Sequence, residues 1–330
     1  MPEITVAILD KFHPHIKAAI AAAAPANWVL LFIEESTLAA RAAVLRDADM
    51  AFVMAVPMPK ELLAAARRLR FIQKLGAGVD RIDLDVCRSR GIGVARLHAG
   101  NSIPVAEHTV LLMLAVYRQL PQIDRRTRAG AWQKEDARGM HRQLQNKTVG
   151  LVGFGAIGRQ VAKRLRGFEV TIIYYDPVRA SRDVEQSLGV SYTDLDELVR
   201  TADIVSLHLP LLPQTAGIID AQRIRAMKPG AVLINCARGD LVDEAALVAA
   251  LKDGHLFGAG IDAFSKEPPV GSNLLELENT VVTSHLAGAT LDNFSGVIAR
   301  AVENAKSFLR GDALPETDVV IAPVRKVPVA

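Results

Sequence analysis

Short apolar runs alternate with amphipathic stretches along the first hundred residues of the chain. Runs rich in Val, Ile and Phe predict strands, whereas apolar residues spaced three and four apart predict helices. Strands are expected within residues 3–10, 28–34, 48–55, 69–76 and 92–98, and helices are expected to begin near His15, Leu38 and Glu61. Strands that alternate with helices in this order are typical of a parallel sheet with helical crossovers.

The alternating pattern restarts after residue 146, beyond a long apolar helix and a polar segment. The helix is expected to open at Asn101 or Ser102 and to run to residue 120, with Pro104 in its first turn. The polar residues 127–146 are expected to cross the surface. Strands are then expected within residues 148–153, 169–176, 203–210, 231–237, 257–264 and 280–285, with helices after Ile157 and near Leu195, Ala221 and Ala245.

These elements predict an α/β protein with two doubly wound parallel-sheet domains, because six strands with helical crossovers are typical of a nucleotide-binding sheet. A flavodoxin-like domain is expected from residues 1–100 and 288–330, and a Rossmann domain from residues 101–287, with a cleft between them. The helical pattern at residues 293–309 is expected to return to the first domain. The tail from Asp318 onward is interrupted by prolines and is expected to be loosely packed.

Composition and charge exclude several classes of function. Lys and Arg total 39 against 36 Asp and Glu, and a net charge of +3 is too small and dispersed to indicate nucleic-acid binding. Cys87 and Cys236 match no metal-ligand spacing, so free thiols and no metal site are expected. The apolar residues 18–33 contain Pro25 and fall short of the roughly 20 residues that cross a bilayer. A cytoplasmic protein without a membrane segment is therefore expected.

A glycine-rich turn joins the first strand of the second pattern to a helix, in the sequence GFGAIG. Glycines in this spacing permit a tight turn, close approach of a pyrophosphate and close helix packing, and the helix N-terminus favours phosphate. Asp176 ends the next strand, where a carboxylate binds ribose hydroxyls and repels a 2′-phosphate, so NAD is favoured over NADP. Arg179 and Arg182 could weaken the preference for NAD, because their positive charges suit a 2′-phosphate. The expected cofactor-binding residues here are Gly153, Gly155, Ala156, Ile157, Gly158 and Asp176.

Polar residues follow three further strands of the second pattern, at positions where an ordinary core needs none. Arg238 follows one strand, Asp262 and then Glu267 follow another, and His285 follows a third. The carboxyl ends of strands line the ligand crevice of an open α/β sheet, so these side chains are expected to converge there. His208, which follows another strand, is expected to be a structural residue.

These motifs resemble those of the D-isomer-specific 2-hydroxyacid dehydrogenase family. The matching segments are LGAGVDRIDLD, GFGAIG, LHLPLLPQTAGII, MKPGAVLINCARGDLVDEAAL, GAGIDAFSKEPP and TSHLAGAT. They occur in the family's order, and the resemblance covers nearly the whole chain. Ser284 departs from the family's usual proline, and Asn146 departs from its usual glycine.

The resemblance implies a role for each polar residue at the strand ends. Arg238 binds the substrate carboxylate and keto oxygen, His285 transfers the proton, and Glu267 partners the histidine. Asp262 lies near the nicotinamide and joins the expected cofactor-binding residues. Hydride addition to a ketone leaves an alkoxide that needs a proton donor, and histidine titrates near neutrality. A carboxylate fixes the tautomer of the ring, and a guanidinium anchors an anion through paired donors.

The first domain is expected to supply the other part of the substrate site. In LGAGVD, Gly76 and Gly78 are expected to free the backbone N–H groups of Ala77, Gly78 and Val79 to face a carboxylate. Together with Arg238 and His285, these three residues are the expected substrate-binding residues.

The expected activity is the NAD-dependent reduction of a small 2-keto acid to a D-2-hydroxy acid, with His285 as general acid and base. Glyoxylate and hydroxypyruvate are typical substrates of the family. Alternatives are an NAD-sensing binding protein resembling the family's corepressors, and phosphite or phosphoglycerate dehydrogenase. Formate dehydrogenases typically carry glutamine at the position of Glu267, which argues against them. The family is usually dimeric, so a homodimer through the long apolar helix and the arm around Trp132 is expected.

Overall fold

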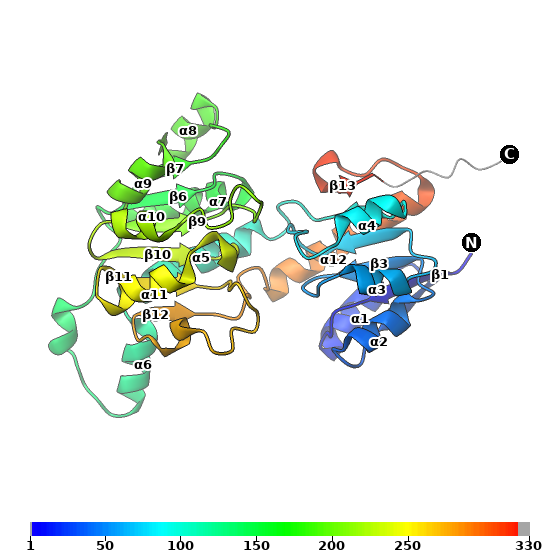
Figure 1. The fold of residues 1–330 in the computed structure, drawn as a ribbon, viewed down its shortest axis with the longest axis horizontal. Helices are drawn as coiled ribbons and strands as arrows, with labels where there is room; N and C mark the ends of the chain where they lie inside the picture. Colours follow the sequence, from blue (N-terminus) through cyan, green and yellow to red (C-terminus); the bar gives the residue numbers. More distant parts are fainter. Residues whose placement is uncertain (1, 323–330) are drawn as a thin grey trace. The chain divides into compact units, whose positions relative to one another are not determined.

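The computed structural model describes residues 2–322, which form two compact units (Figure 1). One unit comprises Met1–Asn101 and Thr290–Ala330, and the other comprises Ser102–Ala289. The sequence analysis places the corresponding boundaries after residues 100 and 287. Each unit buries apolar clusters of its own on both faces of a sheet. This is the α/β architecture predicted from the sequence.

The sheet of the first unit has the strand order β13-β5-β4-β3-β1-β2. Its strands are β1 (Ile4–Ile8), β2 (Trp28–Phe32), β3 (Met50–Val53), β4 (Phe71–Lys74), β5 (Gly93–Ala95) and β13 (Val319–Ile321). Strands β1 to β5 pair in parallel in the order 2-1-3-4-5, which is the flavodoxin-like arrangement. The predicted fold of this unit is therefore confirmed.

Helices cover both faces of this first sheet. They are α1 (Pro14–Ala23), α2 (Leu38–Leu45), α3 (Lys60–Ala65), α4 (Leu84–Ser89) and α12 (Leu291–Arg310). The helix α12 begins after Thr290, whose hydroxyl accepts a hydrogen bond from Asn293 N at 3.3 Å, and it ends at Gly311 in the left-handed conformation. Its Val297 and Ala301 join the core made with β1, β3 and β4. The helix therefore returns to the first unit, as predicted.

The chain after α12 adds the strand β13, which pairs antiparallel with β5. The expectation of a loosely packed tail is therefore wrong for Val319–Ile321. The cause is Asp318, whose wholly buried carboxylate accepts hydrogen bonds from Arg300 Nη2 at 3.0 Å, Asn304 Nδ2 at 3.1 Å and His98 N at 2.9 Å. A buried carboxylate with these partners anchors the segment. Residues 323–330 of the tail lie outside the described residues.

The sheet of the second unit is parallel throughout and has the strand order β12-β11-β10-β9-β6-β7-β8. Its strands are β6 (Thr148–Val152), β7 (Thr171–Tyr175), β8 (Val190–Tyr192), β9 (Ile204–Leu207), β10 (Ala231–Asn235), β11 (Leu256–Ile261) and β12 (Thr280–Val282). The order 3-2-1-4-5-6 of a Rossmann sheet runs from β8 to β11, and β12 extends it. Six strands were expected, and the three-residue strand β8 was missed.

The helices of the second unit lie on both faces of this sheet. They are α5 (Ser102–Tyr117), α6 (Leu120–Arg128), α7 (Ala156–Leu165), α8 (Arg182–Leu188), α9 (Leu195–Thr201), α10 (Ala221–Ala226) and α11 (Glu244–Lys252). The helix α5 ends at Tyr117 instead of residue 120 because Gln119 takes the left-handed conformation with φ 48°. It lies close on β11, where a Cβ added at Gly258 would come within 2.7 Å of Val116.

Residues 127–146 run mostly along the surface, as predicted, with a short 3-10 helix at Asp136–Gly139. Asn146, at the end of this segment, has a φ of 62°. Asparagine tolerates this left-handed conformation better than most residues. The position therefore accepts asparagine where the resembling family has glycine.

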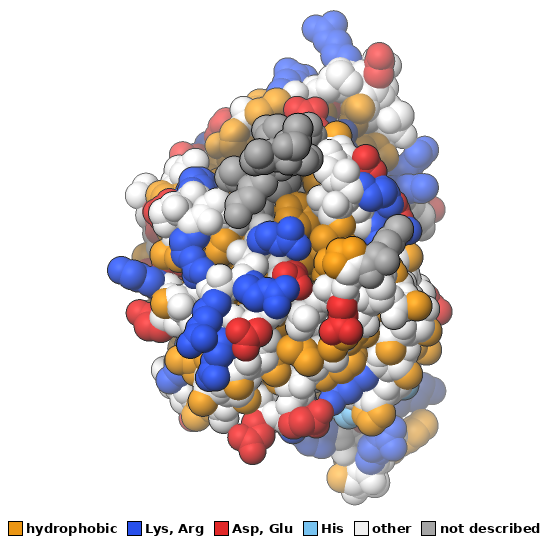
Figure 2. Space-filling view, turned by 90° about the vertical axis from the view of Figure 1, so that its right-hand side faces the viewer, with side chains coloured by type: hydrophobic (Ala, Val, Ile, Leu, Met, Phe, Trp, Pro, Cys, Tyr) orange, Lys and Arg blue, Asp and Glu red, His pale blue; other side chains and the backbone are white. Residues whose placement is uncertain are grey.

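The surface and the thiols agree with the composition. On the face drawn in Figure 2, Lys and Arg side chains are interspersed with Asp and Glu and with hydrophobic side chains. Cys87 and Cys236 are free and buried, and burial raises the pKa of their thiols to about 11 and about 12. Among residues 2–322, no helix has the length and apolar character needed to span a membrane, and no three His, Cys, Asp or Glu side chains gather as metal ligands would.

Candidate active site

The glycine-rich turn lies between β6 and α7, at the point where the strand order of the second sheet reverses. Gly153 has a φ of 99°, and a Cβ there would lie 2.7 Å from the backbone of His208. A Cβ on Gly158 would lie 2.3 Å from Gly153 O. Packing therefore excludes side chains at both positions.

Gly155 differs from the other two glycines, because a Cβ there would meet nothing within 4 Å. It is the residue before α7, whose first N–H groups belong to Ala156 and Ile157. Open space in front of a helix N-terminus suits a pyrophosphate. The turn thus has the shape that a dinucleotide requires.

Asp176 follows β7 and is held beside this turn. Its Oδ2 accepts a hydrogen bond from Phe154 N at 2.8 Å, and its Oδ1 accepts one from Val178 N at 3.0 Å. The carboxylate is half-buried. Its negative charge is therefore fixed next to the open end of α7, where a ribose would lie.

His208 follows β9 and packs behind the glycine turn. Its Nε2 lies 3.0 Å from Ser206 Oγ, and its Nδ1 is buried without a hydrogen-bond partner in the described part of the chain. Burial lowers the pKa of His208 to about 3, so the ring is neutral at physiological pH. This agrees with the structural role expected for the residue.

Replacing His208 is expected to change how stability depends on pH. The pKa of histidine in an unfolded chain is about 6.5. As the pH falls from there toward 3, the unfolded state therefore binds a proton at this position that the folded state does not. The wild-type protein should lose up to about 1.4 kcal/mol per pH unit through this group below pH about 6.5. The His208→Asn variant should show a flatter curve of Tm between pH 7 and 5, and parallel curves would contradict the buried neutral ring.

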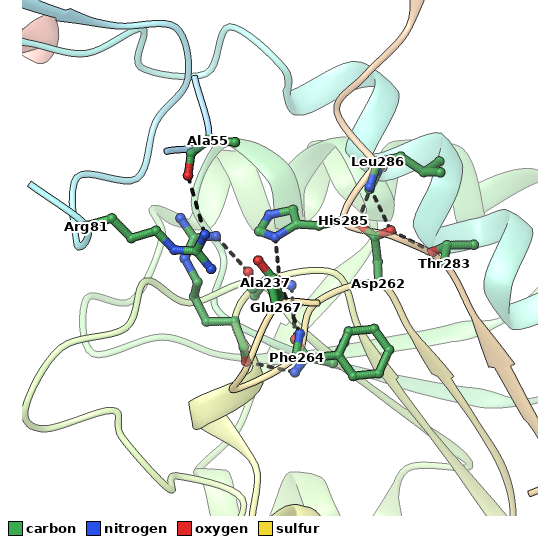
Figure 3. A network of polar contacts seen from close by, with 12 residues as sticks. Ala55, Arg81, Ala237, Asp262, Phe264, Glu267, Thr283, His285 and Leu286 are labelled. Atoms are coloured by element: carbon green, nitrogen blue, oxygen red, sulfur yellow. Dashed lines mark hydrogen bonds and ion pairs between the residues drawn. The ribbon is translucent and has the colours of Figure 1, made fainter. Parts of the chain in front are cut away.

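His285 lies in the loop after β12, in contact with Glu267 (Figure 3). Its Nδ1 lies 2.7 Å from Glu267 Oε1, and the same oxygen accepts a hydrogen bond from Phe264 N at 3.2 Å. The side chain of His285 is 40% exposed, whereas that of Glu267 is 16% exposed. The carboxylate therefore orients the ring, and Nε2 is the ring nitrogen that does not face it.

The backbone of His285 is held in an uncommon conformation. Its φ is 53°, and its N–H donates to Asp262 O at 2.8 Å. Left-handed conformations in residues other than glycine tend to occur at functional sites, where the surrounding structure maintains them. Here the surrounding structure is Asp262, whose backbone carbonyl binds His285 and whose carboxylate binds residues on either side of it.

Asp262 is wholly buried at the end of β11 and anchors the loop that carries the histidine. Its Oδ1 accepts hydrogen bonds from Thr283 Oγ1 at 2.6 Å and Leu286 N at 3.0 Å, and its Oδ2 accepts one from Ala287 N at 3.0 Å. His108 of α5 extends the network, with Nε2 3.0 Å from Thr283 Oγ1. The sequence analysis missed Thr283 and the contact of His108, because only the folded chain brings α5 to this loop.

Arg238 follows β10, and its loop contacts the segment that leads to Glu267. Asn235 Nδ2 donates to Arg238 O at 2.8 Å, and Ala237 N donates to Asn235 Oδ1 at 3.0 Å, which closes the turn. A Cβ on Gly239 would lie 2.0 Å from Ser265 N and 2.1 Å from Phe264 C. The missing side chain therefore lets the two backbones touch, and the contact fixes Arg238 relative to Glu267.

A Gly239→Ala substitution should separate these two loops. The new methyl group meets backbone on the other side, so it should destabilise the fold by about 1 to 3 kcal/mol. It should also reduce kcat/KM by about 10²-fold, since small displacements of positioned groups are costly in catalysis. Gly167→Ala is the matched control, because a Cβ there meets nothing within 4 Å. Equal behaviour of the two variants in turnover and melting assays would refute this role.

The loop LGAGVD of the first unit offers a row of free donors. Within the described residues, the backbone N–H groups of Ala77, Gly78 and Val79 donate to no other group. Three consecutive free N–H groups form a concave site for an anion such as a carboxylate. The role of these three groups in binding a carboxylate stays a prediction.

The neighbouring loop after β3 is held by Asp10, which the sequence analysis did not single out. Its carboxylate accepts hydrogen bonds from Met54 N at 2.5 Å, Ala55 N at 2.7 Å and Val56 N at 3.3 Å. Lys74 Nζ also donates to Met54 O. An aspartate directly after a strand was the available signal, because short acidic side chains there often bind backbone N–H groups of the next loop.

Comparison with known proteins adds an independent line of evidence. Residues 110–287 match the family model described as D-isomer specific 2-hydroxyacid dehydrogenase, NAD binding domain. The chain is 37% identical to D-3-phosphoglycerate dehydrogenase of Mycobacterium tuberculosis, over 94% of this chain and 58% of that protein. It is also 37% identical to glyoxylate reductase of Thermococcus litoralis, over 78% of each. The chain thus spans little more than half the length of the mycobacterial relative.

A solved structure shows the same fold over nearly its full length. D-Lactate dehydrogenase from Aquifex aeolicus, complexed with NAD and lactic acid, superposes with a TM-score of 0.82 at 29% identity. The match covers 97% of this chain and 99% of that one.

Proposed function

The chain belongs to the D-isomer-specific 2-hydroxyacid dehydrogenase family, and we propose that it reduces a small 2-keto acid to the D-2-hydroxy acid with NADH. The observation that carries this proposal is the pair of His285 Nδ1 and Glu267 Oε1 at 2.7 Å. It lies at the same edge of the sheet as the glycine turn. An oriented imidazole beside a dinucleotide site is what a ketone reductase needs.

Bound NADH would supply the hydride at the carbonyl carbon of the substrate. The alkoxide that forms is protonated by His285 Nε2, which is the ring nitrogen that does not face Glu267. The carboxylate of Glu267 stabilises the doubly protonated ring before the transfer, and it keeps the ring oriented afterwards. In the reverse direction the neutral Nε2 accepts the proton from the alcohol.

Arg238 is proposed to bind the keto acid by its carboxylate and carbonyl oxygens. A guanidinium presents paired donors that fit a carboxylate, and its fixed positive charge stabilises the developing alkoxide. The N–H groups of Ala77, Gly78 and Val79 in the first unit are proposed to bind a carboxylate. The anchored contact between Gly239 and the Phe264–Ser265 backbone keeps Arg238 in register with the histidine.

The direct test is NADH consumption with a panel of glyoxylate, hydroxypyruvate and pyruvate, and NAD reduction with D-3-phosphoglycerate. Turnover of at least one substrate is expected, and its kcat/KM identifies the preferred acid. Tight NADH binding without turnover of any member would contradict the enzyme and favour a dinucleotide-sensing protein.

A preference for NAD over NADP is proposed from two features after β7. The first is the carboxylate of Asp176, which would repel a 2′-phosphate. The second is the ion pair of Arg179 with Glu185, in which Nε and Nη2 donate at 2.8 and 3.0 Å. Tyr174 OH also donates to Glu185 at 2.7 Å, and these hydrogen bonds lower the pKa of Glu185 to about 2. The guanidinium that would suit a 2′-phosphate is thus held by a carboxylate.

Releasing Arg179 is expected to weaken this preference. The Glu185→Gln variant should raise the ratio of kcat/KM for NADPH to that for NADH by about tenfold, since the charged partner that holds the guanidinium is lost. Combining it with Asp176→Ser should raise the ratio further. Glu197→Gln, which breaks the exposed pair with Arg200, is the control and should leave the ratio unchanged. An unchanged ratio in Glu185→Gln would show that the ion pair does not influence the choice of cofactor.

A homodimer through the segment from α5 to Met140 is also proposed. Large apolar side chains are exposed along it, with Leu111 at 51%, Leu120 at 52%, Trp132 at 82% and Met140 at 47%. Exposed apolar patches of this kind mark interfaces. In a symmetric dimer, each copy would cover the patch of the other. Light scattering should give the mass of a dimer, and Trp132→Asp should shift it toward a monomer. Val178→Asp changes a comparably exposed apolar side chain outside this segment and should leave the dimer intact. A monomeric wild type would contradict the proposal.

A further inference from the structure

A basic pocket lies in the second unit, at the amino end of its central strand β6. It has a volume of about 540 Å³ and is lined by Arg118, His141, Arg142, Gln143 and Lys147. Arg118 directly follows α5, and Lys147 directly precedes β6. The glycine turn follows the opposite end of β6, and a strand of five residues spans about 16 Å. The pocket is therefore separate from the dinucleotide site.

The charges of the pocket are unbalanced. Three of its lining side chains are permanent cations, and none is a carboxylate. Arg118 and Lys147 make no ion pair with any described residue. Asp203, which precedes β9, is already engaged by Thr148 N at 2.8 Å and Lys228 Nζ at 3.1 Å. Cations that share a hollow repel one another, and a multivalent anion relieves this repulsion.

One of these cations is fixed in place before any ligand arrives. The guanidinium of Arg142 lies 4.0 Å from the ring centre of Phe257, and its Nη1 donates to Gly230 O at 2.5 Å. The backbone N–H of Arg142 also donates to Tyr117 O at 2.9 Å. A guanidinium held by an aromatic face and a carbonyl loses little further entropy when it binds an anion.

His141 also lines the pocket and carries an unsatisfied polar atom. Its Nε2 is buried and has no hydrogen-bond partner among residues 2–322. Buried polar groups in folded proteins nearly always have a partner, and a ligand or water can supply one that the chain does not. The unbalanced charges therefore indicate a binding site for an anion, and a ligand in the pocket would lie next to a histidine that lacks a partner.

We propose that this pocket binds a small phosphorylated metabolite through its phosphate or diphosphate group. Guanidinium groups bind phosphate oxygens through paired donors, and lysine adds a mobile point charge. The volume lies in the range of small-molecule sites and exceeds what one phosphate occupies, so it also accommodates the remainder of the ligand. The site does not depend on the proposed reductase activity.

The test is calorimetric titration of the full chain with pyrophosphate, with the dinucleotide site saturated by NADH and the ionic strength held constant. Saturable binding to one site per chain is expected, and it should weaken as salt screens the charges. The Arg118→Gln/Lys147→Gln double variant should bind at least about tenfold more weakly, which corresponds to about 1.4 kcal/mol. Its turnover without pyrophosphate should equal that of the wild type.

The control is the Lys163→Gln/Lys252→Gln double variant, which removes the same net charge from exposed positions on α7 and α11. It should bind pyrophosphate as tightly as the wild type. Circular dichroism and light scattering establish that all variants share the wild-type fold and assembly. The absence of saturable binding, or equal weakening in both double variants, would overturn the site whether or not the protein reduces keto acids.

Discussion

Replacing His285 by asparagine is expected to lower kcat by about two to four orders of magnitude, the range typical of a positioned general acid. Asparagine cannot transfer the proton to the alkoxide, yet it is polar and tolerates the left-handed backbone conformation seen at this position. The fold and the affinity for NADH should therefore be kept. The measurement is steady-state turnover with the preferred keto acid, together with a fluorescence titration of NADH.

Glu267→Gln separates the role of the ring from that of its partner. The amide can still occupy the position 2.7 Å from His285 Nδ1, but it carries no charge to stabilise the protonated ring. We expect a smaller loss of kcat than in His285→Asn, since the ring keeps a hydrogen-bond partner but loses the charged one. A His285→Asn variant with nearly full turnover would remove the histidine from the mechanism.

The second large effect is expected at Arg238. Substitution by lysine keeps the positive charge but removes the paired donors, so kcat/KM should fall by about 10² to 10³-fold. Because the guanidinium is proposed to hold the substrate carboxylate as well as the carbonyl oxygen, KM should rise while kcat falls. The affinity for NADH should stay unchanged. The measurement is the full dependence of rate on keto-acid concentration.

Arg200→Lys serves as the control for this change, because Arg200 lies on the exposed face of α9 in an ion pair with Glu197. It should leave both kinetic constants as in the wild type. If Arg238→Lys changed neither constant, the loop after β10 would have no part in substrate binding. The contact between Gly239 and Phe264 would then serve the fold alone.

The sequence predicted the elements that have strong local signals. The strands β6, β7, β9, β10 and β11 are apolar runs that end in turn residues, and the turn after β6 carries glycines whose packing requires them. The strand β8 and the helices α4, α6 and α8 were missed. Length alone does not explain this, because β5, β12 and α3 are as short and were predicted. The order of polar residues after the strands also indicated which side chains share one edge of the sheet.

Contacts that depend on tertiary packing could not be predicted. The hydrogen bonds that Asp262 accepts from Thr283, Leu286 and Ala287 join segments more than 20 residues apart in the chain. The wholly buried Asp318 binds Arg300 and His98, and this contact turns an apparently loose tail into a strand. Single residues of this kind have no periodicity, so only the assembled fold reveals their partners.

The central claim is that this chain transfers a hydride from NADH to the carbonyl carbon of a 2-keto acid and yields the D-alcohol. Turnover of pyruvate or hydroxypyruvate with NADH deuterated at its transferable position, followed by mass spectrometry and chiral separation of the product, measures this directly. We predict a D-2-hydroxy acid that carries one deuterium at its second carbon. A product without the label, or one of the L configuration, would contradict the account.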